Sequence, residues 1–145
     1  MPTVQQVAAY FLATWPEDSG EGISNMKLQK LCYYAQGFQL ANIGQPLFQE
    51  AIEAWEQGPV IPELYEGYAS FGLNPVPVPG SFDLNEYTID ERELLDEVRD
   101  LFGQYAAWRL RNMTAEEAPF KQARASGGGV ISLYAMKVYF ESQLS

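Results

Sequence analysis

Apolar side chains recur with helical spacing along most of the chain. From Val4 they fall at i, i+3, i+4, i+7 and i+8, and Thr3 can cap the segment, so we predict an amphipathic helix over residues 3–14. A second helix is expected to begin near Asn25 and to run to about Ala41. The stripe that this second helix should bury is Leu28, Leu31, Cys32, Ala35 and Phe38.

The middle and the C-terminal half contain further helical patterns. A proline begins residues 62–72, and it suits the first turn of a helix because its missing N–H would have no intrahelical partner there. Residues 90–105 combine one apolar face with an acidic first turn, and residues 108–111 extend this helix or begin another. A short helix is predicted over residues 119–124, and Ser132 can cap a final one.

Two short segments indicate β structure. Residues 50–55 are expected to form one strand, and Gly58–Pro59 a turn behind it. Val130–Ile131 follows three glycines, favours extended structure and can pair with that strand. Residues 74–81 carry prolines at every second position, which indicates an extended connector across the surface.

Length and composition favour one folded domain. A chain of 145 residues, 47% of them apolar, can bury roughly two thirds of the surface that its unfolded form exposes. We therefore predict a mainly α (α+β) fold in a single domain over residues 1–145. It should be a compact bundle of six to seven helices with a two- or three-stranded β element near residues 50–55 and 129–132.

The charge balance bears on the kind of partner. Nineteen acidic against nine basic residues give a formal net charge of −10, which repels a phosphate backbone and disfavours nucleic-acid binding. Such a surface would attract a basic protein, although the charge can equally serve solubility alone. Residues 83–100 carry most of the acidic excess, and a solvated helix face is the simpler explanation for it.

Missing residue types narrow the chemistry. The chain has no histidine, so the usual general base and the usual metal ligand are absent, and we predict no catalytic residues, no metal and no cofactor. Cys32 is the one cysteine, so no intrachain disulfide can form, and it is interpreted as a core thiol. Without a signal-like start or a long apolar run, the protein is expected to be cytoplasmic and not membrane-bound.

A second stripe lies opposite the apolar one on the helix near Asn25. Lys27, Lys30, Tyr34 and Gly37 recur at i, i+3, i+7 and i+10, which predicts two cations and an aromatic ring on the exposed side of a core helix. Such residues can anchor a partner. Alternatively, the lysines pair with carboxylates of this acidic chain.

Three other motifs have simpler structural explanations. Gly127–Gly129 lacks the lysine and the strand-to-helix order of a phosphate-binding loop, so a turn is expected. The pairs Glu50 and Glu53, and Glu116 and Glu117, could supply acid–base chemistry only within a cleft that spacing does not establish. Glutamate-rich surface turns are the more common case.

Four blocks of the sequence together resemble a known family. The stretches Ile23–Gly37, Pro46–Phe48, Glu53–Trp55 and Gly58–Val60 are similar to the Panacea family, the SocA-like antitoxin domain, whose members include phage-associated proteins. The resemblance extends to residues that recur further along the chain. These are Thr114, Glu117, Pro119, Ala123, Ile131, Met136 and Phe140.

The resemblance implies a predominantly helical antitoxin that neutralises a toxin by direct protein contact, and it does not imply an enzyme. At least one type in the family presents its toxin to a cytosolic protease. This sequence departs from the family pattern at three places: Gln57, where the family has histidine or another bulky residue; Ala115, where it has histidine; and Phe120, where it has tryptophan. Any role of the family's residues at these positions is therefore in doubt here.

Three hypotheses of different classes follow. The first is an antitoxin that binds a cognate toxin, expected to be basic. The second is an adaptor or orphan interaction module that delivers a client to a cytosolic protease, and the third is an enzyme of unknown class. For the first, the residues expected near the partner are Lys27, Lys30, Tyr34, Trp55, Gln57, Gly58 and Pro59.

Overall fold

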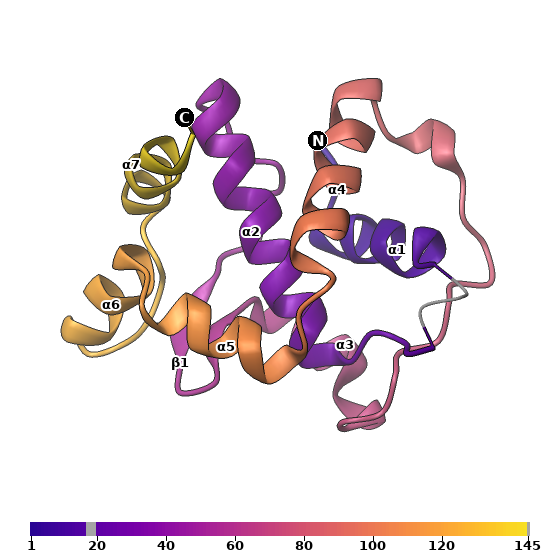
Figure 1. Cartoon of the computed structure of the whole chain (residues 1–145), viewed down its shortest axis with the longest axis horizontal. Helices are drawn as coiled ribbons and strands as arrows, with labels where there is room; N and C mark the ends of the chain where they lie inside the picture. Colours follow the sequence, from indigo (N-terminus) through magenta and orange to yellow (C-terminus); the bar gives the residue numbers. More distant parts are fainter. Residues whose placement is uncertain (17–19, 145) are drawn as a thin grey trace.

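The computed structural model describes residues 1–16 and 20–144. Within these ranges the chain forms seven α-helices and two short strands (Figure 1). The helices are α1 (Val4–Thr14), α2 (Asn25–Ile43), α3 (Pro62–Tyr68), α4 (Ile89–Phe102), α5 (Ala107–Ala115), α6 (Ala118–Ala125) and α7 (Leu133–Gln143). The strands are β1 (Glu53–Trp55) and β2 (Gly58–Val60), and two 3-10 turns are η2 (Ala69–Phe71) and η3 (Leu84–Glu86). The predicted mainly α fold with a minimal β element is confirmed.

Helix α2 is the centre of the molecule. It packs against α1, α3, α4, α5, α7 and β2, and Figure 1 shows α7 on one side of it and α4 on the other. Every residue from Asn25 to Gly37 is buried except Met26, which is half-buried. A helix covered all round has no solvent-facing stripe, so polar residues on α2 must find partners inside the protein.

Local signals place the helix ends. The Thr3 and Thr88 side chains each accept a hydrogen bond from the backbone N–H three residues on. The side chain of that third residue in turn accepts one from the threonine's own N–H, so both helices begin with a capping box. Gly44 ends α2 with a φ of 73° and donates its N–H to the carbonyl of Leu40 at 2.8 Å. The predicted helix over 90–105 ends earlier, at Phe102, and residues 108–111 belong to the separate helix α5.

The β element is an antiparallel hairpin with an added segment. The exposed turn is Glu56–Gln57, so the prediction of a turn at Gly58–Pro59 was wrong by two positions, and these residues open β2 instead. On its other edge β1 receives residues 129–131: Ala54 donates to the Gly129 carbonyl at 2.8 Å, and Ile131 to the Ile52 carbonyl at 2.7 Å. The predicted pairing of Val130–Ile131 with the Ile52 region is confirmed.

The closest packing between helices occurs where α7 crosses α2. A Cβ atom added at Gly37 would lie 2.2 Å from Cε2 of Phe140, so only glycine admits the Phe140 ring at this position. Cys32, also on α2, is fully buried, as predicted for a core thiol. Burial raises the pKa of its sulfhydryl. The core therefore forms along α2 rather than between two separate layers.

Candidate functional site

The predicted contact stripe on α2 does not reach the surface. Lys27, Lys30 and Tyr34 have relative exposures of 8%, 1% and 1%, so the expectation that they lie on the exposed side of the helix was wrong. The physical reason is tertiary packing: α4, α5 and β2 pack against the helix face that the sequence pattern predicted to be exposed. Partner binding by these residues remains a prediction that burial makes harder to satisfy.

The two buried lysines bind backbone carbonyls. Lys27 Nζ donates to the Gly103 carbonyl at 2.7 Å and lies 4.8 Å from the centroid of the Trp15 ring. Lys30 Nζ donates to the Pro59 carbonyl at 3.2 Å. Among the described residues neither lysine has a carboxylate oxygen within 4.0 Å, so the alternative that they form ion pairs with the chain's own acids is not realised there.

Burial has changed the acid–base properties of both amines. Burial, together with a smaller effect of the positive charge of Arg111, lowers the pKa of Lys30 to about 7. Burial also lowers the pKa of Lys27, while the nearby Glu21 carboxylate opposes the change. Lys30 therefore binds its proton more weakly than an exposed lysine does.

The hydroxyl of Tyr34 is hydrogen-bonded to a buried glutamate side chain. Tyr33 and Tyr34 donate to the two carboxylate oxygens of Glu117 at 3.0 Å and 2.7 Å, and the Tyr34 ring stacks on Phe102 with centroids 3.9 Å apart. Burial raises the pKa of Glu117 to about 7, and the tyrosine hydrogen bonds oppose this rise. Glu116 lies exposed beside it, so the pair that the sequence suggested is split between interior and solvent.

The remaining predicted residues lie in or beside the hairpin. Gln57 is exposed in the turn, and Trp55 is half-buried with its ring 5.3 Å from that of Tyr65. Gly58 is buried with a φ of 105°, and a Cβ there would lie 2.8 Å from Cε of Lys30. The structure thus brings Lys30, Gln57 and Gly58 together with Pro59, whereas Tyr34 and Trp55 lie apart from them.

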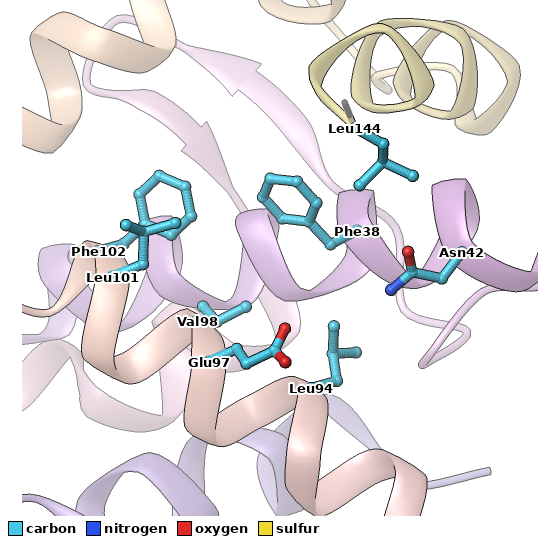
Figure 2. A pocket seen from close by; sticks show the side chains of 8 residues that line it. All are labelled: Phe38, Asn42, Leu94, Glu97, Val98, Leu101, Phe102 and Leu144. Atoms are coloured by element: carbon cyan, nitrogen blue, oxygen red, sulfur yellow. The ribbon is translucent and has the colours of Figure 1, made fainter.

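An apolar groove runs along α2 between α4 and α7. We name it the α4–α7 groove, and it consists of two adjoining depressions that share Phe38, Leu101 and Phe102. Figure 2 shows Leu94, Glu97 and Val98 extending from α4 toward Phe38, while Leu144 reaches the groove from the end of α7. The other lining residues are Asn42, Tyr34, Met113, Glu116, Glu117, Tyr139, Phe140 and Gln143.

The chemistry of this groove is uniform. The charged residues that line it, Glu97, Glu116 and Glu117, are all carboxylates, and most of the other lining side chains are apolar or aromatic. Leu101 is 55% exposed at its edge, although the helical pattern assigned it to the buried face of α4. The sequence signal for this exposed edge is the width of the apolar face of α4, which includes Leu94, Leu95, Val98, Leu101 and Phe102.

The described residues offer neither a metal-ligand cluster nor a membrane-spanning helix. Among residues 1–16 and 20–144, no group of three or more His, Cys, Asp or Glu side chains could hold a metal ion. Within the same residues, none of the helices has the length and apolar character needed to cross a membrane. Residues 127–129 form a turn in which all three glycines have positive φ, as expected for a loop of this composition.

Comparison with known proteins assigns the chain to a family. The family model for the Antitoxin SocA-like, Panacea domain matches residues 28–121, which include most of α2, the hairpin, α3 to α5 and the first half of α6. Over 50 residues the chain is 46% identical to Antitoxin SocA from Caulobacter vibrioides (strain NA1000 / CB15N), a match that covers 34% of this chain and 27% of that protein. The matched region is thus about a quarter of that relative, and no solved structure matches the chain. The chain belongs to the Antitoxin SocA-like, Panacea domain family.

Proposed function

We propose that this protein is a cytoplasmic, non-enzymatic antitoxin that neutralises a toxin protein by direct binding, and that the α4–α7 groove receives the toxin. Membership of an antitoxin family supports the role. The observation that carries the choice of surface is an open apolar groove whose charged lining residues are all carboxylates.

This chemistry defines the segment that would fit. The groove follows α2 between two other helices, a shape that suits an amphipathic helix with its apolar side chains inserted toward Phe38 and Phe102. Lysine or arginine side chains on the flanks of such a helix would meet Glu97 and Glu116. A net charge of −10 adds long-range attraction, which raises the association rate of a basic partner at low salt.

Co-expression with the product of the neighbouring gene tests the proposal. Cells that make the toxin should grow when this protein is present, and the two proteins should be recovered as a complex. Leu101→Arg should abolish the rescue, because it removes an exposed apolar contact at the groove edge and adds a charge that repels a basic partner. Ile89→Arg is the matched control: Ile89 is an apolar residue of α4 that is 69% exposed, more than Leu101, and does not line the groove.

The outcomes are distinct. Full rescue by Leu101→Arg would show that the toxin does not bind in this groove. If the unaltered protein gives neither rescue nor a complex, the antitoxin role is refuted for that pair. The half-life of the toxin separates neutralisation from delivery to a protease. Simple neutralisation leaves toxin abundance unchanged or raised, whereas an adaptor shortens its half-life.

A further inference from the structure

A second groove contains the buried Lys30. This Lys30 groove lies between the first turns of α2, the hairpin turn, the start of α5 and the segment after η2, and its volume is about 460 Å³. It is lined by Ser24, Met26, Lys30, Gln57, Leu73, Ala107, Trp108 and Arg111. It shares none of these residues with the α4–α7 groove, so it is a separate site.

Within residues 1–16 and 20–144, no carboxylate pairs with the two cations of the Lys30 groove. Lys30 is 1% exposed, and among the described residues the Pro59 carbonyl is the one hydrogen-bond acceptor of its ammonium, which has three N–H donors. Arg111 donates to the backbone carbonyl of Glu56 at 3.3 Å. In the described ranges neither side chain has a carboxylate oxygen within 4.0 Å, although acidic residues outnumber basic ones by nineteen to nine.

The conformation of the hairpin maintains this arrangement. Gly58 adopts a φ of 105° beside the Lys30 side chain, and any larger residue would bring a Cβ to 2.8 Å from Lys30 Cε. A buried lysine is unfavourable unless it is paired, and an apolar residue of similar volume would be expected to fill the same space at lower free energy. The Lys30 ammonium lies in this position with unused N–H donors, which indicates a binding site for an anionic group.

Apolar side chains form the rim. Trp108 is 66% exposed and Leu73 is 89% exposed, on opposite elements that line the same groove. The groove is continuous with a neighbouring depression through Ser24, Leu73 and Ala107. An open and elongated depression covers one side of an extended chain, whereas small-molecule sites usually enclose most of their ligand.

We propose that the Lys30 groove binds an extended peptide segment of a protein partner. A carboxylate side chain of that segment, from Asp or Glu, pairs with Lys30 and Arg111 at the groove floor. An apolar neighbour in the segment contacts Trp108 and Leu73 at the rim. This site goes beyond the proposed toxin groove, and it would hold whether or not the protein is an antitoxin.

The affinity of this site for a carboxylate should depend on pH. Among the residues that the structure describes, the charged side chains lining the groove are Lys30 and Arg111 from α5. Lys27 of α2 and Glu21 line the adjoining depression. Because the pKa of Lys30 in the free protein is about 7, the amine is charged at about pH 6 and mostly neutral at about pH 8.5. A carboxylate that requires the charged amine should therefore bind roughly 30-fold more weakly at the higher pH.

The experiment uses a random peptide library displayed on phage, panned in parallel on the full-length protein and on Lys30→Met. Peptides selected by the unaltered protein should contain Asp or Glu next to an apolar residue, and Lys30→Met should not enrich them. Calorimetry on one selected peptide should show about tenfold to a hundredfold weaker binding to Lys30→Met, the cost of removing one charge-assisted pair. Lys121→Met, at an exposed lysine paired with Glu116, should leave the affinity unchanged.

Two further measurements keep the result decisive if Lys30→Met folds poorly. Arg111→Gln, at an exposed residue, should weaken the same peptide, and so should replacement of the peptide's acid by its amide. Equal binding of the acid and amide peptides, or binding that does not fall between about pH 6 and about pH 8.5, would overturn the proposal. Complete displacement of the peptide by inorganic phosphate at comparable concentration would assign the groove to a small anion and overturn it as well.

Discussion

Replacement of Glu117 by glutamine should make the stability of this protein less dependent on pH. Glu117 precedes α6 and accepts hydrogen bonds from Tyr33 and Tyr34 of α2, so it connects the central helix to a late segment of the chain. Glutamine preserves the shape of the side chain. Its oxygen accepts from one tyrosine hydroxyl and its NH2 group donates to the other, so Glu117→Gln removes the charge without leaving a buried polar group unpaired.

The sign and the size follow from the pKa of Glu117. Burial raises it from its ordinary value of 4.5 to about 7, so the folded state holds this proton more tightly than the unfolded state does. The associated stabilisation is fully present below the unfolded-state pKa and is lost as the pH rises through the folded-state pKa. Between about pH 5 and about pH 8 this loss amounts to roughly 2 to 3 kcal/mol of unfolding free energy.

Urea denaturation of the unaltered protein and of Glu117→Gln across this pH range measures the difference. The glutamine variant should gain roughly 2 to 3 kcal/mol relative to the unaltered protein as the pH rises, because the titration of the other carboxylates cancels in the comparison. Glu116→Gln is the matched control, since Glu116 is adjacent and its side chain is 79% exposed. A stability difference between the unaltered protein and Glu117→Gln that does not change with pH would refute the reasoning.

Two further predictions concern packing and buried hydrogen bonds around α2. Gly37→Ala should destabilise the fold by about 1 to 3 kcal/mol in thermal or urea unfolding, because its Cβ would overlap the buried ring of Phe140, whereas Gly67→Ala in an open position of α3 should be neutral or slightly stabilising. Equal effects of the two alanines would contradict the close α2–α7 contact. Gln36→Leu should cost about 2 to 4 kcal/mol, because the Gln36 side chain accepts from two backbone N–H groups before β1, at 2.6 Å and 3.3 Å, and donates to a carbonyl there at 2.8 Å. The exposed Gln45 offers the control: if Gln45→Leu costs as much, the buried hydrogen bonds are not the cause.

The prediction of the fold succeeded where its signals are local. The cap at Thr3, the start of α2 near Asn25 and the apolar periodicity of α4 each depend on residues within a few positions, and each occurs as expected. The same reasoning missed the hairpin turn by two residues. Gly58 looked like a turn residue, but its positive φ serves close packing against Lys30 inside β2.

The prediction of contact residues succeeded less well, because exposure is not a local property. Helical spacing showed correctly that Lys27, Lys30 and Tyr34 share one face of α2, but only the packed neighbours show that this face is buried. Glu117 illustrates the same limit. Its place in an acidic dipeptide indicated a surface turn, whereas the fold brings it against two tyrosines more than eighty residues earlier in the chain.

The sequence by itself determined the helices and their caps, the family, the acidic character and the core thiol. The tertiary structure alone decided that α2 is covered on all sides over residues 25–37, and that Lys30 is buried without a carboxylate partner in the described chain. It also decided that an apolar groove with acidic lining remains open between α4 and α7. The physical reason is the range of the interactions. Periodicity and capping act over a few residues, whereas burial, the pKa of a buried group and the shape of a groove depend on contacts between segments far apart in the chain.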